Sequence, residues 1–276
     1  MIRHKAENRT VKIRNTEMEY AVFGNGPIPA VILPGLSDGL TTVKGKAAVL
    51  SIPYRPFLNE FTVYMFSRAN DLPKGHSISN MAEDQALAMI EAGIPSACVL
   101  GVSQGGMIAE MLAASHPELV RALCLTVTSA CANDVIDERI SCWIDCAEHN
   151  DYGTLLRDTA EHCYSPSYLR KVRAVYPLLE RIGKPKTFDR FLVNAKSILA
   201  FDASSVLASI HCPTLIIGGA KDQIVGTGAA HLLHKAIPQS ELYVYPELGH
   251  GLYEEAKDFY PRVFDFFRTA CAKKES

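Results

Sequence analysis

Six short apolar runs constrain the fold of this 276-residue chain more than any other feature. They are nearly free of charged residues, as expected of strands that are buried on both faces of a parallel sheet. Two further β-rich stretches, at 10–14 and 17–23, open the chain. The six runs lie at 30–35 (AVILPG), 61–66 (FTVYMF), 96–102 (SACVLGV), 121–127 (RALCLTV), 213–219 (PTLIIGG) and 241–245 (ELYVY).

Helical patterns separate these runs. Asn80 followed by Glu83 predicts a helix start, and an apolar side continues until Gly93 ends it. Helical spacing also occurs at 104–115, at 228–236 and from about 253 to 272. Strands that alternate with helices through short links predict a mostly parallel, doubly wound α/β sheet covered on both faces.

One segment, residues 132–201, interrupts the alternation. It has no apolar β-run, only amphipathic stretches separated by glycine and proline. We interpret it as a helical insertion into a core domain made of residues 1–131 and 202–276. An insertion at this place would lie over the C-terminal ends of the strands, where doubly wound folds bind ligands. It is therefore a candidate lid.

Composition narrows the classes of partner. The formal net charge is −2 and the basic residues form no stripe, so we expect no nucleic-acid partner. No apolar run approaches the roughly 20 residues that cross a bilayer, so no membrane partner is expected.

The polar N-terminus has no apolar stretch typical of a secretory signal, and the expected location is the cytoplasm. The eight cysteines include no C-x-x-C pair, which favours reduced thiols.

A glycine-rich hexapeptide, Gly101-Val102-Ser103-Gln104-Gly105-Gly106, follows one strand run and precedes a helical pattern. A sharp strand-to-helix turn at this place would expose the serine hydroxyl at the edge of the sheet. Small neighbours suit such a turn because it brings backbone segments close together. The helix N-terminus would favour negative charge that develops during attack. The pattern predicts a nucleophilic Ser103; the alternative is a glycine-rich turn in which Ser103 only caps the helix.

The stretch VLGVSQGGMIAEMLAASHPELVRALCLT resembles the nucleophile elbow, the following helix and the next strand of α/β-hydrolases. Downstream, CPTLIIGGAKDQIV and YPELGHGLYEEAKDF are similar to the acid and histidine motifs of that family. The resemblance extends from about residue 18 to residue 270, and the insertion falls where family members carry a cap. It implies an α/β-hydrolase fold, a mostly parallel doubly wound sheet with a helical cap insertion.

The resemblance also implies a catalytic triad of Ser103, Asp222 and His250, in the family's chain order of nucleophile, acid and histidine. Asp222 follows a strand run, where its alternative role is that of a turn residue. His250 lies between two glycines after the last run. In the expected chemistry His250 takes the proton of Ser103, while Asp222 orients the imidazole and stabilises its protonated form.

The oxyanion formed on attack needs preorganised hydrogen-bond donors. The resemblance implies the backbone N–H groups of Gln104 and Leu36. Asp38, close to Leu36, is puzzling because a carboxylate that faced the oxyanion would oppose catalysis; we expect it to point away as a turn or cap residue. The segment after the run at 61–66, Ser67-Arg68-Ala69-Asn70-Asp71, departs from the family pattern, since only Arg68 matches the usual Asp-x-Arg-Gly-x-Gly segment. That departure leaves the local shape of the pocket open.

The insertion carries two weaker signals. Its aromatic residues suit an apolar substrate pocket, for which the candidates are Trp143, Tyr164 and Phe191. Its cysteines and histidines make a zinc site conceivable. They lack the spacings of structural zinc modules, so buried thiols and surface histidines are expected and no metal is predicted. These residues are Cys142, Cys146, His149, His162 and Cys163.

The sequence thus predicts a serine hydrolase that cleaves a carboxylic ester or lactone of a small, fairly apolar metabolite through an acyl-enzyme on Ser103. Within the family, the elbow and cap layout look most like the small-molecule esterases and enol-lactonases. Amide, thioester and carbon–carbon bond hydrolysis and a perhydrolase reaction stay open, because they use the same nucleophile, base and oxyanion hole. A ligand-binding receptor or a carrier on this fold is a rival that the intact triad disfavours. No cofactor is expected, and a homo-oligomer is left open.

Overall fold

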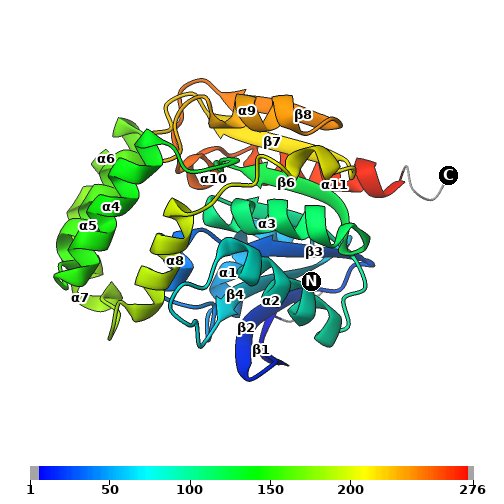
Figure 1. Ribbon diagram of the computed structural model, residues 1–276, viewed down its shortest axis with the longest axis horizontal. Coiled ribbons are helices and arrows are strands. Elements are labelled where there is room, and N and C mark those ends of the chain that lie inside the picture. Colours follow the sequence, from blue (N-terminus) through cyan, green and yellow to red (C-terminus); the bar gives the residue numbers. More distant parts are fainter. Residues whose placement is uncertain (1–5, 273–276) are drawn as a thin grey trace.

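A single eight-stranded sheet runs through the computed structural model, which describes residues 6–272 (Figure 1). The ends of the predicted core range, residues 1–5 and 273–276, lie outside the described residues. The strand order is β1-β2-β4-β3-β5-β6-β7-β8; β1 and β2 pair antiparallel, as do β2 and β4, and all other pairs are parallel. The predicted mostly parallel sheet is thereby confirmed. The strands are β1 Ala6–Ile13, β2 Thr16–Gly24, β3 Ile28–Leu33, β4 Phe61–Ala69, β5 Ala97–Val102, β6 Val120–Thr126, β7 Thr214–Gly219 and β8 Ser240–Tyr245.

Helices cover both faces of the sheet, because neighbouring residues of one strand point to opposite sides. In β3, Val31 and Leu33 join a core cluster with α2, α3 and α9, whereas Ala30 and Ile32 join a second cluster with α1, η2 and α11. This two-sided burial explains why the central strand runs are continuously apolar. The covering helices are α1 Ala47–Leu50, η2 Ile52–Phe57, α2 Ile78–Glu91, α3 Gln104–Ser115, α9 Ala229–Ala236 and α11 Phe259–Ala272.

Two predicted helix boundaries are wrong. Helix α2 begins at Ile78, because the cap is Ser77, whose hydroxyl accepts the backbone N–H of Asn80 at 3.1 Å. The predicted last helix is broken into α10 (Leu252–Glu255) and α11. Pro261 explains the break, since proline lacks an N–H and is tolerated in the first turn of a helix but not in its interior. Five short helices of the core were not predicted: η1 (Leu36–Gly39), α1, η2, η3 (Pro117–Leu119) and η5 (Leu207–Ser209).

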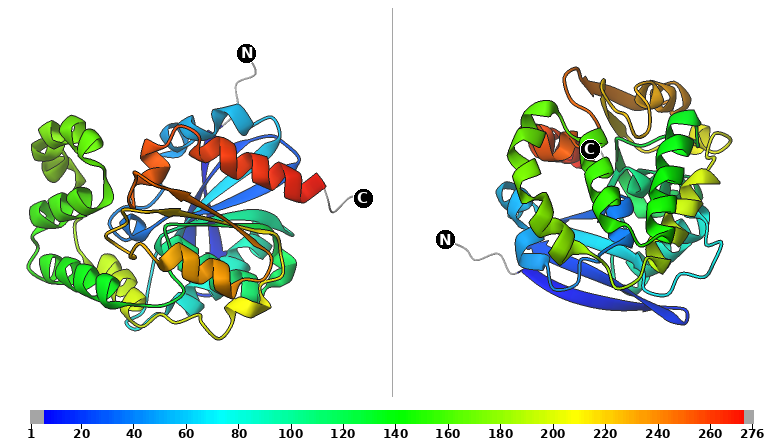
Figure 2. Two further views of the ribbon diagram at one scale, coloured as in Figure 1. Left: turned by 90° about the horizontal axis from the view of Figure 1, so that it is seen from above. Right: turned by 90° about the vertical axis from the view of Figure 1, so that its left-hand side faces the viewer.

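Five α-helices and the 3₁₀ turn η4, between residues 134 and 199, lie in the connection from β6 to β7 and gather at one end of the molecule (Figures 1 and 2). Backbone hydrogen bonds close the base of this segment: Ala132 N–H donates to Phe201 at 2.9 Å, and Ala203 N–H donates to Ala130 at 2.8 Å. Cys131 and Asp202 form an isolated β-bridge at the same place. The chain therefore leaves the sheet and returns to it at one point. The elements are α4 Asp134–Glu148, α5 Tyr152–Cys163, α6 Pro166–Val172, η4 Arg173–Val175, α7 Tyr176–Gly183 and α8 Asp189–Leu199.

A carboxylic acid is buried within α3. Glu110 is fully buried; its Oε1 accepts from the Thr128 hydroxyl at 3.5 Å, and its Oε2 has no partner among the described residues. Burial raises the pKa of Glu110 well above its usual value. The folded chain therefore keeps a proton that the unfolded chain releases. Stability falls as pH rises through the window between the unfolded and the folded pKa.

We expect Glu110→Gln to raise the free energy of unfolding near neutral pH and to change it little below about pH 4, where the glutamic acid is protonated in both states. Glutamine does not titrate, so the difference grows with pH by up to about 1.4 kcal/mol per pH unit. Urea unfolding at several pH values measures this growth. The exposed Glu91→Gln variant is the control. A difference that stays constant with pH would contradict a buried proton on Glu110.

Candidate active site

Ser103 occupies the predicted turn between β5 and α3. Its backbone has φ 54° and ψ −123°, a conformation that residues other than glycine rarely adopt. The Ser103 N–H donates to Thr126 on β6 at 2.9 Å, and its carbonyl accepts from the Gly106 N–H at 2.8 Å. The surrounding hydrogen bonds thus hold a strained residue in place, as is typical of functional sites.

The glycines of the hexapeptide are required by close backbone approach. A Cβ atom on Gly105 would lie 2.0 Å from the carbonyl oxygen of Leu33, and one on Gly101 would lie 2.5 Å from the carbonyl oxygen of Gly105. Neither position has room for any side chain. The turn therefore needs glycine on both sides of Ser103, which is the physical content of the G-x-S-x-G pattern.

The structure brings the three predicted triad residues into one hydrogen-bonded chain. His250 Nε2 lies 3.0 Å from Ser103 Oγ, and His250 Nδ1 lies 2.9 Å from Asp222 Oδ2 and 3.1 Å from Asp222 Oδ1. Asp222 and His250 are both buried. The contacts join residues up to 147 positions apart in the sequence, so the tertiary fold alone creates this arrangement.

The loops that carry the acid and the histidine are fixed by backbone groups. Asp222 Oδ1 accepts the N–H groups of Ile224 at 2.9 Å and Val225 at 3.0 Å. The N–H of Gly251, next to His250, donates to the carbonyl of Cys163 at 2.7 Å. The carboxylate is thereby held with Oδ2 toward the imidazole, and the end of α5 supports the histidine loop.

The predicted oxyanion donors lie at the starts of two helices beside Ser103. A Cβ on Gly35, just before Leu36, would lie 3.3 Å from the Ser103 Cβ, so this loop packs directly against the serine. Leu36 opens η1 and Gln104 opens α3. The first N–H groups of a helix have no acceptor within it. Within residues 6–272, neither amide donates a hydrogen bond, which leaves both available to a ligand oxygen.

Asp38 lies in the turn η1, as expected, and its N–H donates to the Gly35 carbonyl at 3.2 Å, but its carboxylate pairs with distant residues instead of capping a helix. Its side chain is buried, and Oδ2 accepts the backbone N–H of Arg68 at 3.0 Å and Nη2 of Arg190 at 2.7 Å. Nη1 of Arg68 lies 3.7 Å from the same oxygen. Two guanidinium groups therefore neutralise the carboxylate, since a buried charge is stable only when it is paired. Arg68 and Arg190 together carry more positive charge than the Asp38 carboxylate carries negative charge.

A polar face of α8, which was not predicted from the sequence, completes this network. Arg190, Asn194 and Ser197 lie at i, i+4 and i+7 on the helix. Nε2 of Gln104 donates to the backbone carbonyl of Asn194 at 2.8 Å and lies 3.3 Å from Ser197 Oγ. Oε1 of Gln104 accepts from Nη2 of Arg68 at 3.0 Å. A polar stripe in an amphipathic helix normally indicates a solvent face, so only the tertiary structure reveals this role.

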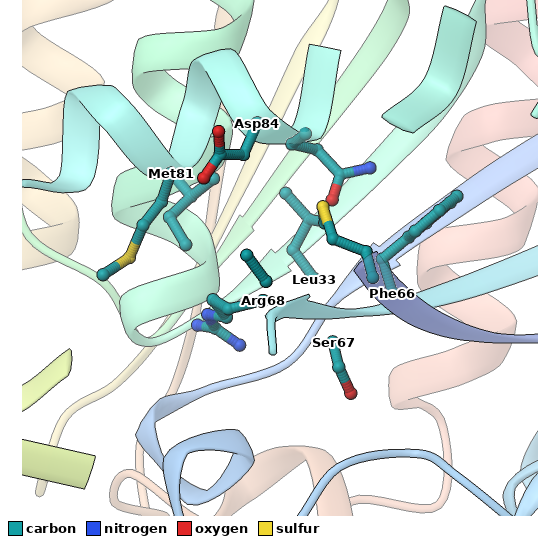
Figure 3. Close-up of a pocket in the computed structure, with 10 residues that line it drawn as sticks. Leu33, Phe66, Ser67, Arg68, Met81 and Asp84 are labelled. Carbon is teal, nitrogen blue, oxygen red and sulfur yellow. The ribbon is translucent and has the colours of Figure 1, made fainter. Parts of the chain in front are cut away.

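Arg68 also borders a small hollow at the end of β4. Figure 3 shows Arg68 on one side and Met81 and Asp84 of α2 on the other. Burial lowers the pKa of Arg68 to about 10, although Asp38 opposes this effect. A second small hollow lies against Asp222. Neither lining includes Trp143, Tyr164 or Phe191, so neither hollow supports those pocket predictions.

The three pocket candidates lie in different surroundings. The Tyr164 ring lies against Gly251 in the histidine loop, where a Cβ would be 2.3 Å from its Cδ1. The Phe191 backbone packs against Gly39 at the end of η1, and its side chain is buried. Nε1 of Trp143 donates to Asp158 at 2.7 Å, so its polar edge is used within the α4–α8 segment. Tyr164 and Phe191 therefore border the loops of the predicted site, whereas Trp143 packs within the segment.

The cysteines and histidines of α4 and α5 do not converge. Cys142 and His149 are exposed, while Cys146 and Cys163 are buried. Within the part of the chain that the structure describes, no three His, Cys, Asp or Glu side chains are placed to hold a metal ion. Over the same residues, every helix is too short or too polar to cross a membrane.

Comparison with known proteins identifies the family of this chain. Residues 77–257 match the family described as serine aminopeptidase, S33. A pimeloyl-[acyl-carrier protein] methyl ester esterase from Chromobacterium violaceum is 30% identical over 215 residues, which cover 72% of this chain and 82% of that protein.

Solved structures agree in fold. An α/β hydrolase from a Medee basin deep-sea metagenome library superposes with a TM-score of 0.82 at 20% identity, covering 94% of this chain and 97% of that one. The enol-lactonase of Burkholderia xenovorans LB400 superposes with a TM-score of 0.78 at 21% identity, covering 94% and 99%. With the family match, these likenesses establish that the chain belongs to the serine aminopeptidase S33 family of the α/β-hydrolase superfamily and is a hydrolase enzyme that resembles small-molecule esterases.

Proposed function

We propose that the enzyme hydrolyses a carboxylic ester or lactone of a small, fairly apolar metabolite through an acyl-enzyme on Ser103. The observation that carries this proposal is the continuous hydrogen-bonded chain from Ser103 Oγ through His250 to Asp222. A relative named as a methyl ester esterase supports the choice of a carboxylic ester. The neighbour named as an enol-lactonase shares only the fold, so the lactone rests on the chemistry common to both substrates.

The mechanism follows from the positions of the three side chains. A serine hydroxyl is a weak nucleophile, so His250 Nε2 takes its proton as Oγ attacks the ester carbonyl. The Asp222 carboxylate accepts a hydrogen bond from Nδ1–H of His250 and stabilises the imidazolium that forms. Collapse of the tetrahedral intermediate breaks the bond to the alcohol oxygen, which receives the proton from His250. Water then hydrolyses the acyl-enzyme by the same steps, with His250 again as the base.

The oxyanion is the charge that this site must stabilise. We assign its donors to the N–H groups of Leu36 and Gln104, which start helices on two sides of Ser103 and have no protein acceptor among the described residues. The dipoles of backbone amides at a helix start favour negative charge. One such donor contributes about 10²–10³-fold to turnover in serine hydrolases.

The α4–α8 segment, residues 132–201, is proposed as a cap over this site, with the core domain formed by the rest of the chain. Tyr164 and Phe191 border the histidine loop and the oxyanion loop, respectively. Both are aromatic, and apolar walls with a few polar groups are typical of pockets for small molecules. This placement supports a fairly apolar substrate held between the segment and the triad.

The proposal is tested by treating the protein with a fluorophosphonate and measuring its intact mass, followed by peptide mapping. We expect one label per chain, on Ser103. A panel of methyl esters, lactones, thioesters and amides then ranks the leaving groups, and we expect esters and lactones to have the highest kcat/KM. Folded protein that resists labelling but binds panel compounds would support the receptor alternative and reject the enzyme mechanism.

A further inference from the structure

We propose that α8 is a positioning element of the oxyanion hole: Arg190, acting through Asp38, and the Asn194–Ser197 turn, acting through Gln104, together set the separation of the two donor amides. The inference rests on the proposed function, because it concerns the same oxyanion. It assigns roles to residues that neither touch the substrate nor belong to the triad.

The first branch fastens the oxyanion loop to α8. Nη2 of Arg190 donates to Asp38 Oδ2 at 2.7 Å and to the Arg68 carbonyl at 3.0 Å, and Nη1 donates to the Asp38 carbonyl. Asp38 lies two residues after Leu36 in the single turn of η1. Because this turn is so short, a shift of Asp38 moves the Leu36 N–H with it.

The second branch fastens the start of α3 to the same helix. The Gln104 side chain is fully buried; its amide donates to the Asn194 carbonyl at 2.8 Å, and its oxygen accepts from Arg68 at 3.0 Å. Gln104 is the residue whose own N–H is the other proposed donor. Its side chain therefore limits rotation of the peptide that presents this N–H to the oxyanion.

Arg68 links the two branches, since its backbone N–H donates to Asp38 and its guanidinium donates to Gln104. The cluster contains one carboxylate and two guanidinium groups, so its formal charge is +1 when all three are ionised. A positive cluster beside the oxyanion stabilises the developing charge, in contrast to the effect of an unpaired Asp38. The network thus explains why a carboxylate is tolerated in this loop.

Helix α8 is also fastened to the rest of the proposed cap, by a different residue. Lys196, on the same helix, pairs instead with Glu148 at the end of α4, at 2.7 Å. Arg190 thus connects α8 to the oxyanion loop, whereas Lys196 connects it to another helix of the segment. The two positions form a matched pair, because each variant removes one salt bridge from one helix and only one of these bridges leads to the active site.

The test compares Arg190→Met with Lys196→Met, using p-nitrophenyl butyrate as the substrate. We expect Arg190→Met to lower kcat by about 10–100-fold with KM within about two-fold, because a displaced donor weakens only the transition state. The affinity for a trifluoromethyl ketone, whose serine adduct carries an oxyanion, should fall by the same factor. Lys196→Met should retain wild-type kcat, and Arg190→Lys should recover only part of the loss, since one ammonium cannot reproduce the fork of a guanidinium.

The inference is overturned if Arg190→Met keeps wild-type kcat, if Lys196→Met loses as much, or if KM alone rises. Thermal unfolding and circular dichroism report whether Arg190→Met folds. If it does not, Gln104→Met tests the second branch with the same readouts and without a change of charge. Fluorophosphonate labelling of the wild type separates the two proposals: an unlabelled wild type rejects the proposed function, whereas a labelled wild type with an equally fast Arg190→Met variant rejects only the positioning role.

Discussion

Replacement of Ser103 by alanine is expected to lower kcat for p-nitrophenyl butyrate by at least about 10⁴-fold and to abolish labelling by a fluorophosphonate. Ser103 Oγ is the group that His250 Nε2 contacts at 3.0 Å, and no acyl-enzyme forms without it. In serine hydrolases, loss of the nucleophile costs nearly as much as loss of the whole triad, and the remaining rate reflects the oxyanion hole and binding alone.

The fold of this variant should be intact, because alanine removes one oxygen and keeps the backbone hydrogen bonds of Ser103 to Thr126 and Gly106. Ser129→Ala is the control. The Ser129 side chain is buried close to the carboxyl end of β6, and its hydroxyl donates to the Cys131 carbonyl rather than to a histidine. Equal loss of activity in both variants would show that the effect is structural, and a fully active Ser103→Ala protein would reject the nucleophile assignment.

Those features that depend on local sequence could be predicted. The apolar runs became strands because two-sided burial demands uninterrupted apolar residues, whichever helices cover them. The turn at Ser103 was predictable because Gly101 and Gly105 have no room for a side chain, and such steric requirements leave a direct mark on the sequence. Asp222 and His250 could be proposed only through resemblance, since their meeting depends on the register of the parallel strands.

The supporting network could not be predicted in the same way. On α8, Arg190, Asn194 and Ser197 have the spacing of a solvent-facing stripe, and periodicity reports which residues share a face but not what covers that face. The ion pairs of Asp38 could not be predicted because its partners, Arg68 and Arg190, are 30 and 152 positions away. Long-range ion pairs of this kind have no local signal, which is why positioning residues are harder to find from sequence than nucleophiles.

Replacement of Asp222 by asparagine is expected to lower kcat by about 10⁴-fold while the protein stays folded. Asp222 Oδ1 accepts two backbone N–H groups, from Ile224 and Val225. An asparagine oxygen must take that position, so its NH₂ group replaces Oδ2 and faces His250 Nδ1. The imidazole then accepts a hydrogen bond at Nδ1 and carries its own proton on Nε2, toward Ser103. A histidine in this tautomer cannot take the serine proton.

The expected change of the His250 tautomer distinguishes a catalytic aspartate from the turn residue that the sequence alone also allowed. A turn residue would lose little on substitution, because asparagine is as favourable in turns as aspartate. The measurement is kcat for p-nitrophenyl butyrate together with the rate of fluorophosphonate labelling, which should fall in parallel since both need the base. Asp202→Asn, which changes an exposed carboxylate that accepts from the Ser204 N–H at 2.8 Å, is the matched control and should keep wild-type rates. If Asp222→Asn also kept them, His250 would not depend on this carboxylate, and the acid of the triad would have to be sought elsewhere.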